Sequence, residues 1–281
     1  MNTVITLMLD EAQQKELEYR YNAFRTDPPA WALFQLRPEG CTITCYSSGK
    51  TVFQGKRAEE YAAEYRKDDT VVLPQAGSDE VGTGDYFGPV CVAAVYLDRN
   101  SMPLIQKLGV RDSKQMTDDI IRRTAPHLME HLIHSLLIVP PEKYNDIHRQ
   151  YNMNAVKSLL HNQAYNSLKE RIALPELMVI DQFTPERSYY RYLQGRGDIV
   201  TGIRFETKAE NAYPAVGAAS IIARYAFLRT MDRMEEEWQM NFAKGSGTAA
   251  DDCAREFVRL YGRERLSQVA KIHFKNTERI S

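Results

Sequence analysis

Apolar and polar residues alternate at short spacing over the first 65 or so residues of the chain. Residues 4–9 are predicted to form a strand, and the mostly polar residues 11–24 a helix that ends before Asp27-Pro28-Pro29. Three short β-like runs and a closing helix follow, at residues 32–36, 41–46, 51–54 and 57–65. The order β-α-β-β-β-α predicts a small antiparallel sheet backed by helices.

The pattern changes after residue 76. Residues 90–97, 133–139 and 177–180 are near-continuous apolar runs, as the buried strands of a mixed or parallel sheet require. Residues 155–172 repeat apolar positions at helical spacing, and Asn154 is placed to cap that helix. Alternating strands and helices predict an α/β domain, so the chain as a whole is α+β. We therefore expect a small domain at 1–67, a linker at 68–76 and a larger domain at 77–281.

The composition is typical of a soluble globular protein. Of the 281 residues, 43% are hydrophobic and 26% are charged. No apolar run approaches the roughly 18 residues that span a bilayer, and residues 4–9 lack the basic segment of a signal peptide. We expect a cytoplasmic protein that does not enter a membrane. The four cysteines are irregularly spaced, which favours buried free thiols over a zinc site.

The net charge of −1 argues against a simple electrostatic clamp for nucleic acid. Residues 1–76 carry 9 basic and 11 acidic side chains, and the remainder carries 27 and 26, so neither part is strongly basic. A nucleic-acid partner must therefore be inferred from local patches and from the chemistry of particular residues.

Two adjacent carboxylates, Asp79 and Glu80, precede a glycine-rich turn and a buried strand. Gly82 and Gly84 let the backbone approach a ligand closely and direct amide donors toward it. The spacing fits neither the dinucleotide-binding nor the P-loop pattern. An ordinary solvated turn is the alternative interpretation of this stretch taken alone.

Two further carboxylates follow apolar strands. Asp181 comes directly after the run at 177–180, where open α/β sheets build their sites, and Glu210 follows the run at 203–205. Each is also compatible with a solvated strand end. Together the four carboxylates suit hard cations such as Mg²⁺, and a pair of such ions hydrolyses phosphodiesters in known two-metal sites. Softer ligands at metal-binding spacing are absent from the sequence, which disfavours zinc or copper.

These stretches together resemble the type 2 ribonucleases H. Residues 77–89 are similar to the first motif of that family, and Gly82-Thr83-Gly84 resembles the form of the ribonuclease HIII group, where ribonuclease HII usually has Gly-Arg-Gly. The similarity continues in order through residues 112–114, 151–155, 180–181, 208–210, 218–224, 244–245 and 271–277. The group also has an N-terminal domain that resembles the TATA-binding-protein fold, which the pattern of residues 1–67 fits.

The resemblance implies a fold, an activity and a set of residues. It implies a ribonuclease H-like domain with a mixed central sheet flanked by helices, which hydrolyses the RNA strand of RNA–DNA hybrids and leaves 5′-phosphate and 3′-hydroxyl ends. It implies two Mg²⁺ ions, with Mn²⁺ as a substitute. The implied catalytic and metal ligands are Asp79, Glu80, Asp181 and Glu210. Because ribonuclease HII has Asp at the last position, Glu206 is the alternative to Glu210.

The implied substrate contacts lie in both domains. They are Gly82, Thr83, Gly84, Ser113 and Lys114 in the larger domain, and Lys50, Lys56 and Arg57 in the smaller one. An ordinary surface lysine is the alternative for Lys114.

Three hypotheses about the function of the chain stay open at this point. Besides the hybrid-cutting enzyme, they are a ribonuclease HII-like enzyme that nicks at single ribonucleotides in DNA and a non-catalytic hybrid-binding protein. A monomer is the default expectation. The basic residues Arg255, Arg259 and Arg263 are expected on a solvated helix face. For the tyrosines at 189, 190 and 192, packing in the core or at an interface is favoured over base stacking.

Overall fold

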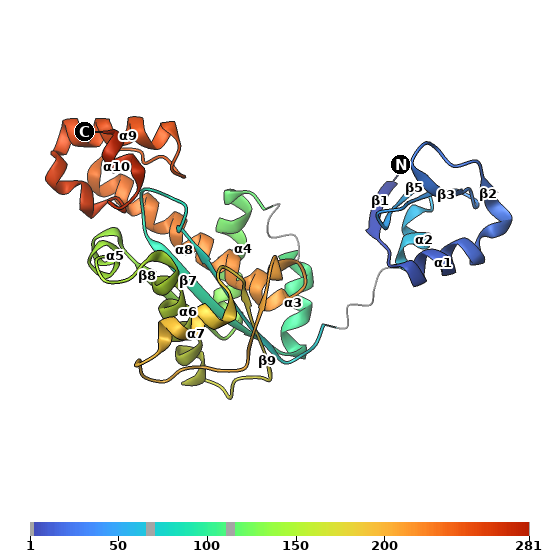
Figure 1. Ribbon diagram of the computed structural model, residues 1–281, viewed down its shortest axis with the longest axis horizontal. Helices are drawn as coiled ribbons and strands as arrows, with labels where there is room; N and C mark the ends of the chain where they lie inside the picture. The colour runs from blue at the N-terminus through green and yellow to red at the C-terminus, as the bar shows by residue number, and fades with distance from the viewer. Residues whose placement is uncertain (1–2, 66–70, 111–115, 281) are drawn as a thin grey trace. The chain divides into compact units, whose positions relative to one another are not determined.

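The computed structural model describes residues 3–65, 71–110 and 116–280. Its contacts divide the chain into two units, Met1–Thr70 and Val71–Ser281, which are coloured blue and cyan to red in Figure 1. The first strand of the second unit begins at Gln75, so the last two residues of the predicted linker, 75 and 76, belong to that strand. Ser113 and Lys114 lie outside the described residues.

Within residues 3–65, an antiparallel sheet has the strand order β1-β5-β4-β3-β2. Its strands are β1 (Thr3–Met8), β2 (Arg25–Thr26), β3 (Ala32–Leu36), β4 (Thr42–Tyr46) and β5 (Lys50–Gly55). The helices are α1 (Glu11–Arg20), the 3-10 helix η1 (Asn22–Phe24) and α2 (Ala58–Ala63). The predicted element order is confirmed, with β2 as an added short edge strand. The predicted helix at 11–24 is split, because α1 stops at Arg20 and the chain tightens into η1.

The alternation along β5 separates the two faces of this sheet. Phe53 is buried and packs in one cluster with Leu17 of α1 and Ala62 of α2, so the helices cover that face. Lys50 and Gln54 alternate with Phe53 onto the opposite face and are exposed. Among residues 3–65, the N-terminal unit thus has its own core and one sheet face that no helix covers.

The second unit is built on a mixed sheet, as the sequence predicts. Within residues 71–110 and 116–280 its strand order is β10-β9-β6-β7-β8. The pairs β10–β9 and β9–β6 are parallel, and β6–β7 and β7–β8 are antiparallel. The strands are β6 (Gln75–Val81), β7 (Val90–Leu97), β8 (His134–Val139), β9 (Leu177–Asp181) and β10 (Ile203–Glu206).

Helices flank both faces of this sheet. They are α3 (Met102–Lys107), α4 (Asp118–His131), α5 (Pro141–His148), α6 (Met153–Lys169), α7 (Glu186–Leu193), α8 (Pro214–Trp238), α9 (Thr248–Tyr261) and α10 (Lys275–Arg279). The 3-10 helices are η2 (Arg99–Ser101), η4 (Ala209–Asn211) and η5 (Arg263–Gln268). The predicted cap of α6 was wrong: Asn154 lies inside the helix, and Asn152 caps it by accepting a hydrogen bond from the Ala155 amide at 2.9 Å.

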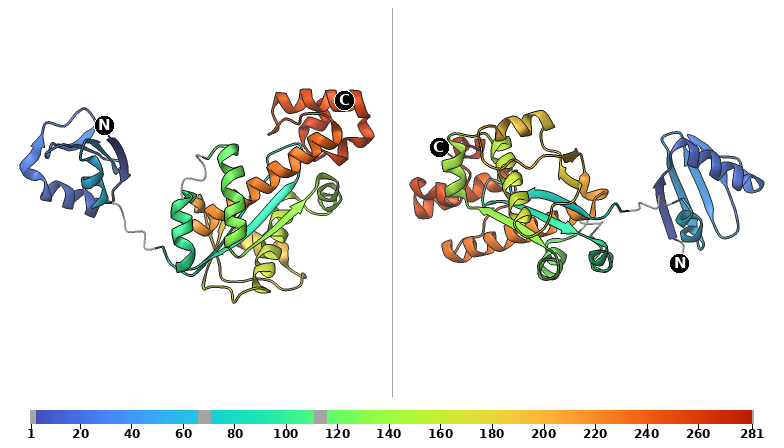
Figure 2. Two further views of the ribbon diagram at one scale, coloured as in Figure 1. Left: turned by 180° about the vertical axis from the view of Figure 1, so that it is seen from behind. Right: turned by 90° about the horizontal axis from the view of Figure 1, so that it is seen from below.

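Strand β7, next to the central strand β6, supplies side chains to two cores. Cys91, Ala93 and Val95 join a cluster with α4 and α8, whereas Val92 and Ala94 join another with α6 and α7. Because successive strand residues face opposite ways, α8 and α6 lie on opposite faces of the sheet (Figures 1 and 2). This two-sided covering explains why the strands are apolar without alternation.

Individual predictions about burial can be checked directly. Cys41, Cys45 and Cys91 are buried free thiols, and Cys253 is a partly buried one. Tyr189 is fully buried in the cluster with α6, which confirms core packing for that tyrosine. In the described part of the chain, no helix has the length and apolar character needed to cross a membrane.

Candidate active site

Two candidate carboxylates, Asp79 and Asp181, lie near the carboxyl ends of neighbouring parallel strands of the mixed sheet. Ser78 of β6 pairs in parallel with Ile180 of β9, so Asp79 and Asp181 follow at the same level on neighbouring strands. Asp181 in turn pairs with Glu206 of β10. It is the last residue of β9, whereas the sequence placed it directly after that strand. The carboxyl ends of parallel strands are where open α/β sheets build their sites.

The adjacent carboxylates Asp79 and Glu80 point to opposite faces of the sheet. The Ser78 hydroxyl lies 2.8 Å from Nδ1 of His161 on α6, and Nε2 of the same ring lies 2.9 Å from Oε2 of Glu80. Asp79 instead accepts a hydrogen bond from the hydroxyl of Ser220 on α8. Strand alternation therefore splits the pair, with Glu80 held on the α6 side and Asp79 on the α8 side.

Glu80 is bound by two side chains of α6. Lys157 forms an ion pair with Oε1, and its ammonium also lies 4.1 Å from the centre of the Phe183 ring. The Glu80 side chain is only 11% exposed, and His161 is fully buried. Burial acts to raise the pKa of Glu80, but the hydrogen bond and charge of His161, together with Lys157, hold it below its usual value. Glu80 is thus kept as a carboxylate.

Asp79 has the opposite electrostatic balance. Burial first, and then the negative charges of Glu80 and Asp181, raise its pKa to about 7, although the Ser220 hydroxyl and the Glu80 amide oppose the shift. The Glu80 amide donates to Oδ1 of Asp79 at 2.8 Å. Near neutral pH this carboxyl group is therefore poised to take up either a proton or a cation.

Asp181 also fixes the turn that carries the fourth acidic residue. Its Oδ1 accepts a hydrogen bond from the amide of Ala209 at 2.9 Å, which holds the start of η4. Glu210 lies in η4 and is 3% exposed. The alternative ligand Glu206 accepts a hydrogen bond from the Tyr213 hydroxyl at 3.2 Å. Of these two carboxylates, Glu210 is the more deeply buried.

The glycine-rich turn follows β6 directly. Gly82 has a φ of +96°, and a Cβ there would lie 2.1 Å from the carbonyl oxygen of Pro89, so the position requires glycine. Thr83 is partly buried, and Gly84 is exposed with open space around its Cα. The chain at Gly84 is accordingly accessible to a ligand.

The donor chemistry of this site fits a hard cation. The four side chains offer only carboxylate oxygens, and the pKa of Asp79 is raised by burial first and then by the neighbouring negative charges of Glu80 and Asp181. Within residues 3–65, 71–110 and 116–280, no three His, Cys, Asp or Glu side chains are gathered in an arrangement that could hold a metal ion. Glu80 is held on the α6 side by Lys157 and His161.

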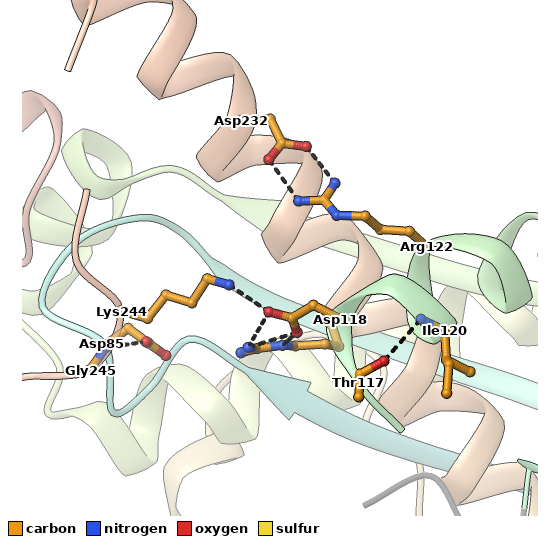
Figure 3. A network of polar contacts seen from close by, with 9 residues as sticks. Asp85, Thr117, Asp118, Ile120, Arg122, Asp232, Lys244 and Gly245 are labelled. Carbon is orange, nitrogen blue, oxygen red and sulfur yellow. Dashed lines mark hydrogen bonds and ion pairs between the residues drawn. The ribbon is translucent and has the colours of Figure 1, made fainter. Parts of the chain in front are cut away.

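A second polar cluster lies next to β6 and was not predicted from the sequence. Asp118, at the start of α4, contacts both Arg224 of α8, at 3.0 Å, and Lys244, at 2.5 Å (Figure 3). The amide of Gly245 donates to Oδ1 of Asp85 at 2.6 Å, which ties the Lys244 segment to the glycine-rich turn. These residues are far apart in the chain, so no local pattern joins them.

The basic residues predicted to bind substrate in the N-terminal unit have different surroundings. Lys50 lies on the sheet face without helices, and Lys56 is exposed just after β5. Arg57 pairs with Glu60 at 2.7 Å and with Glu39 at 3.3 Å, so its charge is already engaged. Lys50 and Lys56 are the better placed of the three to meet an anionic ligand.

The basic stripe predicted near the C-terminus is paired on its own helix. Arg255 and Arg259 contact Asp252 and Glu256 within α9, as expected of a solvated helix face, whereas Arg263 lies beyond the helix in η5.

Comparison with known proteins agrees with this arrangement. The sequence profile of the ribonuclease HII family matches residues 76–277, and that of a domain of unknown function, DUF3378, matches residues 2–77. The chain is 42% identical to ribonuclease HIII of Geobacillus sp. (strain WCH70), over 89% of this chain and 88% of that one. It is 37% identical to ribonuclease HIII of Bacillus subtilis (strain 168), over 99% and 96%.

A solved structure is similar along the whole chain. The crystal structure of Bst-RNase HIII in complex with Mn²⁺ matches with a TM-score of 0.75 and 36% identity, over 99% of this chain and 98% of that one. The profile covers most of the second unit, and the Bacillus subtilis relative covers 99% of the chain. The chain therefore belongs to the ribonuclease HIII family.

Proposed function

We propose that this protein is a metal-dependent endonuclease that hydrolyses the RNA strand of RNA–DNA hybrids and leaves 5′-phosphate and 3′-hydroxyl ends. The observation that carries the proposal is the pair Asp79 and Asp181, two carboxylates at the same level of neighbouring parallel strands beside an accessible glycine-rich turn. Such a turn brings backbone donors to a phosphate, and the carboxylates attract the cations that a phosphodiester needs for hydrolysis. Membership of the ribonuclease HIII family supports the same activity.

The four carboxylates have distinct roles in this proposal. Asp79, Glu80, Asp181 and Glu210 would hold the cations, with Asp79 and Asp181 as the principal ligands. Two Mg²⁺ ions, or Mn²⁺ in their place, supply an activated water and stabilise the leaving oxygen when they are bound. The buried negative charge around Asp79 attracts them, and His161 keeps Glu80 oriented and ionised until they bind.

The substrate contacts in this proposal lie in both units. Gly82, Thr83 and Gly84 lie against the strand on either side of the scissile phosphate and contact the 2′-hydroxyl that separates RNA from DNA. Lys50, Lys56 and Arg57 of the N-terminal unit, and Ser113 and Lys114 of the second unit, add contacts to the backbone. A monomer and a cytoplasmic location complete the proposal, and gel filtration and cell fractionation test them.

The test is cleavage of three labelled duplexes: a continuous RNA–DNA hybrid, a DNA duplex with one embedded ribonucleotide, and DNA alone. Wild type and Asp79→Asn are compared with Mg²⁺, with Mn²⁺ and without metal. Asp198→Asn is the control, because the same substitution there changes an 83% exposed carboxylate. We expect internal, metal-dependent cuts in the hybrid that fall at least about 100-fold in Asp79→Asn and not in the control.

Other outcomes have definite meanings. Cutting restricted to the single embedded ribonucleotide indicates a ribonuclease HII-like enzyme. Hybrid binding by wild type without cleavage in either metal indicates a non-catalytic binding protein and contradicts the proposal.

A further inference from the structure

Arg224 and Lys244 share a single carboxylate beside the candidate active site. Arg224 donates to Oδ1 of Asp118 at 3.0 Å, and Lys244 donates to Oδ2 at 2.5 Å (Figure 3). Within these three side chains, two positive charges against one negative charge leave an excess of one positive charge, and a further anion, Asp232, also acts on Lys244. The side chains are 30%, 46% and 34% exposed for Arg224, Lys244 and Asp118, so the excess charge faces solvent and is reachable by a ligand.

The cluster lies within one helical turn of the metal-ligand candidates. Ser220, which donates to Asp79, precedes Arg224 by four residues on α8, a rise of about 6 Å along the helix. A pocket at this point is lined by residues of β6, α4 and α8, among them Val81, Ser220 and Arg224. The cluster is therefore close enough to Asp79 to contact the same nucleic-acid strand.

The segment that carries Lys244 is also hydrogen-bonded to the glycine-rich turn. The Gly245 amide donates to Oδ1 of Asp85 at 2.6 Å, and the Tyr86 amide donates to the Gly245 carbonyl at 2.9 Å. The lysine therefore extends from a segment that is bonded to the same turn whose backbone at Gly84 is open to a ligand. A strand lying on the turn passes next to Lys244.

The neighbouring pair Arg122 and Asp232, on the same two helices, differs from the Asp118 cluster in its balance of charges. Arg122 of α4 contacts Asp232 of α8 through two hydrogen bonds, at 2.5 and 2.7 Å (Figure 3). That pair joins α4 to α8 with one charge of each sign. Asp118 and Arg224 already join the same helices, so the addition of Lys244 is not needed for their contact.

We propose that Arg224 and Lys244 form a binding site for a backbone phosphate of the hybrid, next to the scissile one, and that Asp118 holds the two cations in place until substrate binds. The inference rests on the proposed function, because the ligand is the nucleic acid on which the enzyme acts. A phosphate oxygen takes the place of the Asp118 carboxylate on the cations, and charge-assisted bonds to phosphate are among the stronger contacts available to Arg and Lys. Asp118 competes with substrate for them.

The test is the salt dependence of binding to an RNA–DNA hybrid, measured by fluorescence anisotropy without divalent metal so that no cleavage occurs. Each phosphate contact contributes about 0.9 to the slope of log affinity against log salt. We expect Lys244→Gln to reduce the magnitude of this slope by about 1 and to weaken binding several-fold, while Lys244→Arg retains both. Asp118→Asn is expected to tighten binding several-fold, because the cations are released from their competitor.

Arg122→Gln is the matched control, since it removes an arginine that joins the same helices. It should lower the melting temperature and leave the salt slope unchanged. An unchanged slope in Lys244→Gln, or weaker binding in Asp118→Asn with its fold intact by circular dichroism, overturns the inference. Failure of wild type to bind or cut the hybrid instead rejects the proposed function, so the two failures are distinguishable.

Discussion

At the scale of single residues, Glu80 and Lys157 form an ion pair that is almost removed from solvent. Their side chains are 11% and 10% exposed. We predict that Lys157→Met lowers the free energy of unfolding by about 3 kcal/mol in the absence of metal, because it leaves a buried carboxylate with less compensation. If Glu80 is a metal ligand, Mn²⁺ should then stabilise the variant more than wild type, since the competing ammonium is gone.

Thermal melting with and without Mn²⁺ measures both effects. Lys169→Met on the same helix is the control, because Lys169 is 58% exposed and lies 3.8 Å from the exposed Asp198. Equal or smaller stabilisation by Mn²⁺ in Lys157→Met contradicts the idea that Lys157 competes with a cation for Glu80.

Lys271 is fully buried and donates to the carbonyl oxygen of Gly88 at 2.6 Å. Burial lowers its pKa to about 7, although Asp85 and Cys91 oppose the shift. The unfolded chain, with a lysine pKa near 10.5, binds more protons than the folded chain between about pH 7 and 10.5. This lysine therefore makes the free energy of unfolding rise with pH across that window.

We predict that Lys271→Met loses this pH dependence. The difference in unfolding free energy between wild type and variant should shift in favour of wild type as the pH is raised from about 7 to 9, as measured by urea denaturation. Lys275→Met, which removes an exposed lysine of α10, should show no such trend. A difference that stays constant over this range means that Lys271 remains charged in the folded protein.

The residues of the site differ in how far the sequence could reveal them. Asp181 adjoins a strand whose apolar run is a local signal. Asp79 lies inside β6, whose sequence Gln75–Val81 has no apolar run, so this strand was not predicted and the pairing of Asp79 beside Asp181 did not follow from the pattern. Lys157 and His161 lie four residues apart, on one face of a helix whose apolar positions were recognised. That spacing was a usable signal, but it does not say which strand residue the pair contacts.

The contacts of the polar cluster at Asp118 could be predicted from the sequence even less well. Its partners Arg224 and Lys244 are 106 and 126 residues away along the chain. Only the packing of α4 against α8 brings Arg224 to Asp118, and only the bonds of Gly245 to the glycine-rich turn position Lys244. Local hydrophobic periodicity carries no information on either contact.

At the scale of elements, the close packing of β6 on α8 positions Asp79. A Cβ at Gly77 would lie 2.4 Å from the amide nitrogen of Val216, so the strand and the helix are in backbone contact there. We predict that Gly77→Ala separates them, lowers the free energy of unfolding by about 1–3 kcal/mol, and reduces cleavage because Asp79 moves away from Ser220.

Denaturation and hybrid-cleavage assays on the same preparations measure the stability and the activity of the variant. Gly197→Ala is the control, since that exposed glycine has open space where the Cβ would lie. Wild-type stability and activity in Gly77→Ala would mean that the strand can shift without cost and that this contact does not position the site.

At the scale of the whole molecule, the chain consists of two units with separate cores. The cluster around Phe53 contains only residues of the first unit, and the clusters on either side of β7 contain only residues of the second. All four candidate carboxylates belong to Val71–Ser281. The chemistry is therefore expected to be complete in the second unit, with the first unit adding affinity through Lys50 and its open sheet face.

We predict that the fragment of residues 71–281 folds and cuts a continuous hybrid with a kcat within a few-fold of the full chain and a KM at least about 10-fold higher, because a linked second binding surface is lost. Lys50→Glu in the full chain should raise KM in the same direction by a smaller factor. Steady-state kinetics at fixed Mg²⁺ measures both, and circular dichroism checks that the fragment is folded. A folded fragment with an unchanged KM would show that the N-terminal unit does not bind the hybrid. A folded fragment with a wild-type KM but a greatly reduced kcat would mean that the first unit contributes to the chemistry itself.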